Sequence, residues 1–405
     1  MKIYFFKIIS ALLNLLVVSY VVKEMPQSIS EDYLLSLAYV VLAALIVSLG
    51  IDTGIERYAY RILAIYSKRL VLSGILAVSV LRAVLIYLFA LMINVEEVTR
   101  ITTGSFAFAL AFASFLFLSC TALLNGVSQY NESAISHVIR GVVRLSIILI
   151  PVSAVSLKNL LLFETTAALI ATFYCIIYFI RIEQKTTGSK PEGSAVLRFL
   201  MWNWFARFSL NFISLNTVKI FILQSNHPSA LLYAYAVQLT QSLERFLPSK
   251  VLAGRYRPQL SILFDKKEFA TLTNQFKTLN LYTTIITFLI SAAHLVIIPA
   301  AFYLVSKPLP GNFVSLILIC AAWLFLINIV YSLNIVSNVL ERNYIIFVTS
   351  LVTSVFFVGT IWFGENLDPI NLLSTLIVSI ILYPLIWFLA SVQSLRLLCD
   401  ENKRH

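Results

Sequence analysis

The chain has 405 residues, of which 60% are hydrophobic and only 12% are charged. About a quarter of the residues in a typical soluble domain are charged, so this composition excludes an ordinary soluble fold and indicates a protein that lies in a bilayer. A net charge of +11 suggests nucleic-acid binding only in a soluble protein. In membrane proteins, basic residues gather in cytoplasmic loops during insertion, and we therefore expect no nucleic-acid partner.

Apolar runs between charged or Pro/Gly-marked breaks divide the chain. A helix needs about 20 mainly apolar residues to cross a bilayer. The first run follows Lys2 and Lys7 and lacks a small-residue cleavage site, which predicts an uncleaved first helix. The runs predict an all-α polytopic membrane protein of about twelve transmembrane helices, at residues 5–22, 33–50, 70–93, 101–123, 135–155, 159–180, 199–223, 229–249, 278–304, 312–336, 343–363 and 369–394.

The polar stretch 181–198 is rich in Gly, Ser and charged residues and contains a Pro, which is typical of a flexible linker. It predicts an N-terminal six-helix lobe at 1–180 and a C-terminal six-helix lobe at 199–405, the latter ending in a cytoplasmic tail. Two halves of this kind suit a transporter that works by alternating access, with its substrate between the lobes.

Basic residues are distributed unevenly between the predicted loops. With the N-terminus in the cytoplasm, the inner loops and chain ends hold twenty basic residues, and the outer loops hold only Lys23, Arg100, Lys158 and Lys307. Because Lys and Arg accumulate on the cytoplasmic side, both termini are predicted to face the cytoplasm.

Six basic residues lie inside the apolar runs, at Arg82, Arg140, Arg144, Arg207, Lys219 and Arg245. The acids in or at the edge of these runs are Glu164 and Glu244. Each charge inside a bilayer costs about 2.5–3.5 kcal/mol on insertion scales. The surplus of positive charge therefore predicts a water-filled cavity with a wall that attracts anions.

These six residues have two readings. Arg82, Arg144 and Arg207 lie deep within their runs, so they are predicted to line the cavity, with pairing to polar neighbours as the alternative. The other three lie closer to a helix end, where the side chain could instead reach the membrane surface.

Polar residues form a stripe on the seventh predicted helix. Asn203, Arg207, Asn211 and Ser214 follow one another at helical spacing. The first helix offers Lys7, Ser10 and Asn14, and it holds the equivalent position in the other lobe. These faces predict a shared central cleft, although hydrogen bonding between helices explains such stripes as well.

Charged residues also cluster after the second predicted helix, at Asp52, Glu56, Arg57 and Arg61. They are predicted to form a gate of ion pairs at the cytoplasmic mouth. The alternative is a solvated loop, in which each pair contributes ~0–1 kcal/mol. Glu244 is the acid best placed to bind a coupling ion.

Enzyme signatures are missing from the sequence. No P-loop, HExxH, GxSxG or GxGxxG pattern occurs, and the four cysteines and four histidines are scattered. The sequence therefore predicts a protein that is not an enzyme and that holds no metal or cofactor.

Two stretches resemble a known family. Gly50-Ile-Asp-Thr-Gly-Ile-Glu-Arg-Tyr58 and Leu124-Asn-Gly-Val-Ser-Gln-Tyr130 look like those of Wzx-type O-antigen and polysaccharide flippases. This family belongs to the multidrug/oligosaccharidyl-lipid/polysaccharide exporter superfamily. The resemblance implies a monomer in the bacterial inner membrane, built as a V-shaped pair of six-helix bundles around a central cavity.

The implied substrate is an undecaprenyl-pyrophosphate-linked oligosaccharide, a repeat unit of O-antigen or another surface polysaccharide. It would pass from the inner to the outer leaflet with its prenyl tail in membrane lipid, and the implied partners are a polysaccharide polymerase and chain-length proteins. Arginine suits such a substrate because its guanidinium binds phosphate through two hydrogen bonds. The predicted substrate-binding residues are Arg82, Arg140, Arg144, Arg207 and Lys219 for the anionic groups and Asn203 and Asn211 for the glycan.

Two alternatives remain. A multidrug antiporter of the same superfamily exports cations, so its cavity is expected to be lined with acids. An O-antigen polymerase or ligase is expected to carry a sizeable outer loop, whereas the outer loops predicted here are short.

Overall fold

The computed structural model describes residues 2–47, 50–93, 105–149, 155–182, 193–225, 227–251, 256, 260, 263–264, 268–340, 342–363 and 368–402. Within these ranges the chain is helical almost throughout and contains no β-strand. The predicted all-α class is confirmed.

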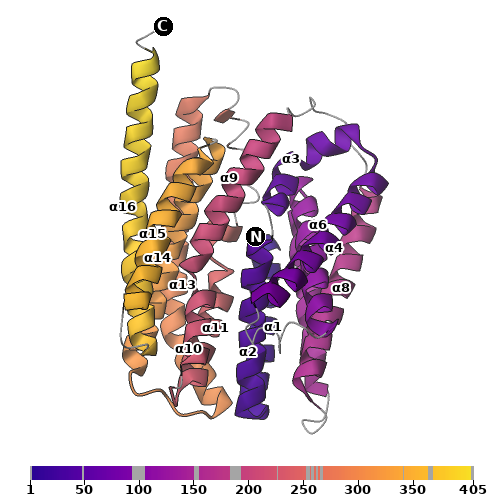
Figure 1. Cartoon of the computed structure of the whole chain (residues 1–405), viewed down its shortest axis with the longest axis vertical. Helices are drawn as coiled ribbons and strands as arrows, with labels where there is room; N and C mark the ends of the chain where they lie inside the picture. The colour runs from indigo at the N-terminus through magenta and orange to yellow at the C-terminus, as the bar shows by residue number, and fades with distance from the viewer. Residues whose placement is uncertain are drawn as a thin grey trace.

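The helices of the first half of the chain are coloured indigo to magenta in Figure 1, and several of them run along the long axis of the bundle. They are α1 (Lys2–Glu24), α2 (Gln27–Ile46), α3 (Ile51–Ile65), α4 (Lys68–Ile93), α6 (Ser105–Gly126), α7 (Tyr130–Leu145), the short 3-10 helix η1 (Ser146–Leu149) and α8 (Leu157–Arg181). We call the end of the bundle where α16 ends the upper end, and the end where α1 meets α2 the lower end, as they lie in Figure 1.

The second half continues in the same manner. Its helices are α9 (Gly193–Phe212), α10 (Leu215–Gln224), α11 (Ala230–Glu244), α13 (Phe269–Val305), α14 (Phe313–Val339), α15 (Asn343–Phe363) and α16 (Pro369–Asn402).

The predicted membrane crossings agree with these helices. Nine helical stretches of the described ranges are long and apolar enough to cross a membrane, and the remaining predicted crossings overlap α2, α7 and α11 in part. The segment 199–223 is one exception to a one-to-one match, because the helix breaks at Ile213. There Ser214 caps a new helix, α10, by accepting a hydrogen bond from the Thr217 backbone amide at 3.3 Å.

The stretch after α2 differs from its prediction. It was expected as a cytoplasmic loop, yet it forms the helix α3, whose residues Tyr58, Ala59 and Leu63 are buried. The physical reason is an apolar face at helical spacing. Gly50 precedes α3 with φ 68°, a left-handed conformation that glycine adopts without strain.

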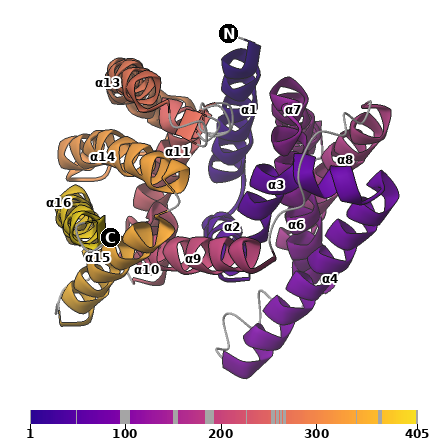
Figure 2. The ribbon, with the colours of Figure 1, turned by 90° about the horizontal axis from the view of Figure 1, so that it is seen from above.

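Helices α1 to α8 and α9 to α16 form two lobes (Figure 2). Most packing lies within each lobe, as between α6 and α8 or between α9 and α15, while α2 packs chiefly against α10 of the other lobe. The lobe limits 1–180 and 199–405 stay predictions. Most of the predicted linker 181–198 lies outside the described residues, although α8 reaches Arg181 and α9 begins at Gly193 within it.

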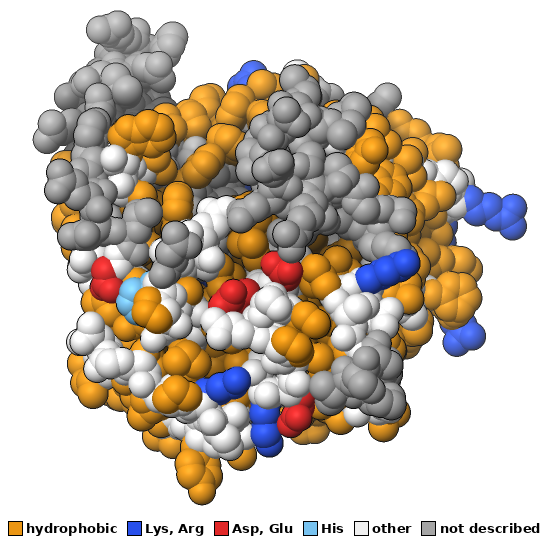
Figure 3. All heavy atoms as spheres, turned by 60° about the horizontal axis from the view of Figure 1, so that its bottom comes forward, with side chains coloured by type: hydrophobic (Ala, Val, Ile, Leu, Met, Phe, Trp, Pro, Cys, Tyr) orange, Lys and Arg blue, Asp and Glu red, His pale blue; other side chains and the backbone are white. Residues whose placement is uncertain are grey.

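The lobes share one apolar core toward the lower end. Val18 and Val22 of α1 and Leu34 of α2 are buried together with Val218 and Ile222 of α10. Figure 3, which brings the lower end forward, shows hydrophobic side chains over much of the described surface and only scattered charged ones. Burial of the apolar side chains in the shared core holds the lobes together at the lower end.

Candidate functional site

Polar contacts connect the two lobes along a seam between α1 and α11. Ser19 and Tyr235 share a hydrogen bond of 2.8 Å, and Asn14 Nδ2 donates to Ser242 Oγ at 2.7 Å. Residue numbers fall along α1 as they rise along α11, which shows that the two helices run antiparallel. Lys7 lies further up α1, and Arg245 follows α11 directly. Lys7 and Arg245 lie within electrostatic range of each other.

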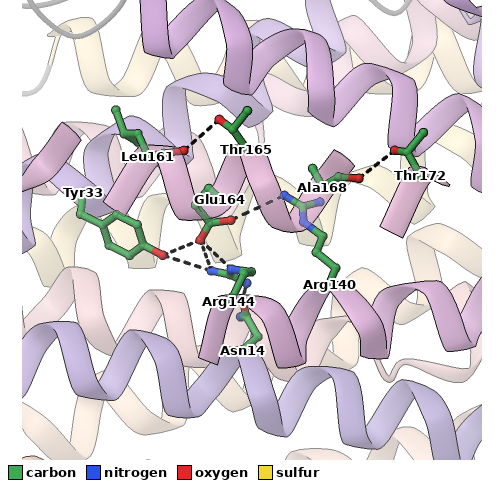
Figure 4. A network of polar contacts seen from close by, with 9 residues as sticks. All are labelled: Asn14, Tyr33, Arg140, Arg144, Leu161, Glu164, Thr165, Ala168 and Thr172. Carbon is green, nitrogen blue, oxygen red and sulfur yellow. Dashed lines mark hydrogen bonds and ion pairs between the residues drawn. The ribbon is translucent and has the colours of Figure 1, made fainter. Parts of the chain in front are cut away.

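A buried charge network adjoins this seam at Asn14 (Figure 4). Arg144 of α7 pairs with Glu164 of α8 at 2.5 Å, and its Nε donates to the same carboxylate at 2.6 Å. The Tyr33 hydroxyl of α2 donates to Glu164 at 2.7 Å, and Arg144 also donates to Tyr33 and to Asn14 Oδ1. The Arg144 guanidinium is therefore surrounded by acceptors from three other helices, as a buried charge requires.

Arg140 lies one helical turn before Arg144 and is held more loosely. Its Nη2 is 3.7 Å from Glu164, beyond hydrogen-bonding distance, and 24% of its side chain is exposed. The guanidinium lies 5.2 Å from the centre of the Phe117 ring, a cation–π contact. Within the described part of the chain, the buried Arg140 Nε has no hydrogen-bond partner.

Lys7, Arg140 and Arg245 form what we call the cationic cluster. All three lie within electrostatic range of the His137 ring, so they occupy one neighbourhood, although they come from α1, α7 and the end of α11. Arg245 is exposed, whereas nearly all of α11 before it is buried. Solvent therefore reaches the cluster at a point bordered by both lobes.

The surroundings of the cluster carry an excess of positive charge. The cations are Lys7, Arg140, Arg144, Arg245 and Lys250, and the carboxylates in range are Glu56, Glu164 and Glu244. Among the described residues of these contacts, five cations and three carboxylates leave two positive charges in excess. Among the described residues, no carboxylate lies within ion-pair distance of Lys7 or Arg245, so both are available to an anion.

Glu244 ends α11 in a separate buried centre. Its carboxylate accepts hydrogen bonds from Lys250 Nζ at 2.6 Å, Trp323 Nε1 at 3.0 Å and the Tyr331 hydroxyl at 3.0 Å. The Lys250 ammonium also lies 4.5 Å from the centre of the Tyr331 ring. The predicted coupling residue is thus surrounded by donors, one of them a cation.

Arg82 lies apart from these residues. It is 1% exposed and bonds to Asp52 of α3 at 3.1 Å and to Ser119 of α6 at 3.2 Å, while Ser119 donates to Asp52 at 2.7 Å. These three hydrogen bonds connect α3 to α4 and α6. For Arg82, the structure therefore shows pairing with polar neighbours, the second of the two readings from the sequence.

The predicted stripe on α9 is bonded within its own helix. Asn203 donates to the Phe199 carbonyl at 3.1 Å and Asn211 to the Arg207 carbonyl at 2.6 Å. Arg207 is half-buried. Lys219 is 1% exposed and donates to the side-chain oxygens of Gln238 and Gln241, so it does not extend to the membrane surface.

The predicted gate residues make different contacts from those expected. Asp52 pairs with Arg82, while Arg57 reaches the other lobe, where it donates to the Asn338 carbonyl at 3.2 Å and lies 4.5 Å from the centre of the Phe199 ring. Glu56 is half-buried in α3. The side chain of Arg61 lies outside the described residues. Arg57 is thus the member of this group that joins the lobes at the upper end.

Sequence reasoning missed Lys7, Arg245 and Tyr33 as members of the site. Lys7 was assigned to a polar face without a role in binding, and for Arg245 the membrane surface was the favoured one of two readings. The signal in the sequence was their occurrence near the same predicted face of the membrane, in helices one and eight. Tyr33 gave no signal, because only the packing of α2 beside α8 places it against Glu164.

No protein-family model matches the chain, and no curated protein matches its sequence. Several solved structures are similar to it over nearly the whole length. One is an outward-facing conformation of a multidrug resistance MATE family transporter of the MOP superfamily, with a TM-score of 0.69, 15% identity and coverage of 98% of this chain and 94% of that chain. Another is an inward-facing conformation of a multidrug resistance MATE family transporter of the MOP superfamily. Its TM-score is 0.65 at 15% identity, with coverage of 96% of this chain and 96% of that chain.

A third similar structure is MATE in the straight conformation, with a TM-score of 0.66, 16% identity and coverage of 99% and 95%. At such identities the likeness concerns the fold. The superfamily and the Wzx type inferred from the sequence stay predictions. The chain therefore has the fold of the MATE transporters of the MOP superfamily.

Proposed function

We propose that this protein is an alternating-access transporter for a lipid-linked anion, namely an undecaprenyl-pyrophosphate-linked oligosaccharide. The observation that carries the proposal is the exposed Arg245 between the lobes, with Lys7 and Arg140 in electrostatic range and no carboxylate pairing Lys7 or Arg245 among the described residues. A polyvalent anion is the cargo that such a site attracts.

The chemistry of pyrophosphate fits these residues. Guanidinium groups bind phosphate oxygens through paired, charge-assisted hydrogen bonds, and the ammonium of Lys7 adds a point charge. The cluster takes these groups from both lobes, so a bound anion contacts α1 and α7 on one side and the end of α11 on the other. The affinity for the cargo therefore depends on the relative position of the lobes.

Orientation in the membrane follows from the same assignment. We place the upper end in the cytoplasm, because the basic loops and both termini are predicted there. The cationic cluster then lies toward the cytoplasmic side, where a lipid-linked precursor would enter, and the apolar core shared by the lobes closes the outer side. The bacterial inner membrane is the proposed location.

A second candidate is export of several drugs. The similar solved structures named as multidrug resistance transporters favour this reading. The charge of the cluster argues against cationic drugs, since two positive charges in excess repel them. Anionic or neutral drugs remain compatible with the site.

The test is complementation of a bacterium that lacks its oligosaccharide flippase, with long-chain surface polysaccharide as the readout. The variants are Lys7→Gln and Arg245→Gln, compared at equal membrane abundance. Lys23→Gln is the matched control, because Lys23 is also basic but lies at the lower end with 48% of its side chain exposed. We expect the control to support surface polysaccharide and the two cluster variants to lose it.

A parallel assay uses a strain without its drug exporters. Resistance to cationic dyes conferred by the chain, and unaffected by Arg245→Gln, would contradict the proposal and support the multidrug reading. Deletion of the chain from its natural host that leaves lipid-linked units unpolymerised in the outer leaflet would instead indicate that the chain acts as a polymerase.

A further inference from the structure

Arg140 and Arg144 share one carboxylate but not equally. Arg144 is 2.5 Å from Glu164 and also bonds to Tyr33 and Asn14, whereas Arg140 is 3.7 Å from Glu164 and makes no hydrogen bond to it. Charge attraction falls with distance, and a charge-assisted hydrogen bond adds to it only at the shorter range. Glu164 is therefore bound firmly to Arg144 and weakly to Arg140.

Accessibility differs in the same sense. The Glu164 side chain is 3% exposed and that of Arg144 is 9%, compared with 24% for Arg140. Figure 4 shows Arg140 and Arg144 approaching Glu164 from the same helix, with Tyr33 and Asn14 gathered on the Arg144 side only. A ligand can thus reach Arg140, while Arg144 and Glu164 stay enclosed.

Arg140 also has hydrogen-bonding capacity left over. Its buried Nε has no partner among the described residues, and an unsatisfied buried donor is costly. The loosely held Nη2 and the unpartnered Nε together could bind two phosphate oxygens once Arg140 turns away from Glu164. The nearby Lys7 and Arg245 would hold the remainder of the same ligand.

From this arrangement, and resting on the proposed function, we propose that Glu164 is a built-in counter-anion of Arg140 that selects for cargo with two linked phosphates. A pyrophosphate bound by Lys7 and Arg245 has a second phosphate with which to displace Glu164 from Arg140. A single phosphate is held by Lys7 and Arg245 alone and leaves the Arg140–Glu164 pair in place. Glu164 acts through Arg140 and is a positioning residue that sets specificity.

The test measures binding of inorganic pyrophosphate and orthophosphate to the full chain in nanodiscs of zwitterionic lipid, at constant ionic strength. We expect the wild-type protein to prefer pyrophosphate. Arg140→Gln should lower pyrophosphate affinity about tenfold, the net value of two charged hydrogen bonds formed at the expense of the Glu164 pair, and leave orthophosphate affinity unchanged. Because Arg140 is partly exposed, this variant is expected to fold.

A second variant, Arg144→Gln with Glu164→Gln, keeps the total charge and removes the counter-anion. It should raise orthophosphate affinity about tenfold, because Arg140 becomes available to a single phosphate. Lys23→Gln, at the opposite end, should change neither affinity. Size-exclusion profiles show which variants are folded. If the double variant does not fold, the binding data for Arg140→Gln alone test the role of Glu164.

The outcomes separate the two proposals. Failure of the wild-type protein to bind either anion contradicts the anionic cargo and the role of Glu164 together. If the wild-type protein binds pyrophosphate but Arg140→Gln weakens both anions equally, the cargo proposal survives and the role of Glu164 is wrong. The same holds if a folded double variant keeps the wild-type preference.

Discussion

Asn14 donates to Ser242 across the lobes at 2.7 Å while its side-chain oxygen accepts a hydrogen bond from Arg144. One amide thus joins the buried charge network of the first lobe to α11 of the second. Rocking of the lobes at this level must break the Asn14–Ser242 bond, whereas the Arg144–Asn14 bond lies inside one lobe and can persist.

This geometry predicts unequal effects of two substitutions. Ser242→Ala removes the bond from Asn14 and a bond within α11 to the Gln238 carbonyl, and should lower the free energy of unfolding by about 1–2 kcal/mol. Asn14→Ala also deprives the buried Arg144 of an acceptor and should cost about 2–4 kcal/mol. Thermal unfolding in detergent, followed by size exclusion, measures both.

The control for this pair is Ser10→Ala. Ser10 donates to the His137 carbonyl at 3.2 Å, a bond of similar kind between α1 and α7 of the same lobe. Ser10→Ala should lower stability as Ser242→Ala does. Only Ser242→Ala should change the distance between spin labels placed on the two lobes. Equal shifts in that distance for Ser10→Ala and Ser242→Ala would show that the seam does not hold the lobes.

The sequence predicts the membrane helices well and the charge partners poorly. Composition and apolar length locate the helices because each must satisfy the bilayer by itself. Partners such as Tyr33 and Glu164, or Asp52 and Arg82, depend on which helices are neighbours. That information is held in long-range packing, which one sequence does not reveal.

The helix α3 was within reach of sequence reasoning. Ile51, Ile55, Ala59 and Leu63 lie at helical spacing, and the charged residues between them drew attention to a loop instead. Short amphipathic helices at a membrane surface carry mixed charge on one face by nature. The arginines of the apolar runs had two readings from the start, and Arg82 and Arg144 turn out to be enclosed by polar partners.

Glycine in α6 allows α3 to pack closely, which yields a second prediction. A Cβ at Gly126 would lie 2.6 Å from the Ala59 Cβ and 2.8 Å from the Glu56 carbonyl oxygen. Gly126→Ala should therefore destabilise the protein by about 1–3 kcal/mol, because backbone must move to admit the methyl group. The measurement is again thermal unfolding in detergent.

Gly74 of α4 is the matched control, since nothing lies within 4 Å of a Cβ built there. Gly74→Ala should raise stability by about 0.5–1 kcal/mol through its better helix propensity. A loss of stability at both positions would mean that the close contact between α3 and α6 is not what distinguishes them.

The Arg82–Asp52 pair leads to a third prediction. Arg82→Gln leaves Asp52 without its 3.1 Å cation and should cost about 3–5 kcal/mol. Adding Asp52→Asn removes the uncompensated charge and should recover much of the loss. Arg198→Gln, at an exposed position of α9, should have little effect. If the double variant is no more stable than Arg82→Gln, the ion pair is not the source of the loss.

Glu244 gives the last prediction, which concerns energy coupling. The Lys250 ammonium, 2.6 Å from the carboxylate, occupies the position that a coupling cation would take, and Trp323 and Tyr331 fill further acceptor sites. A proton or sodium ion would have to displace an internal cation from a buried pair, which is costly. We therefore expect any dependence of transport on a proton or sodium gradient to survive Glu244→Gln in inverted vesicles, at reduced protein abundance.

Lys250→Gln should reduce abundance more strongly, because it leaves the Glu244 carboxylate buried without a cation. Loss of gradient dependence in a Glu244→Gln protein of normal abundance would assign the coupling ion to this carboxylate after all.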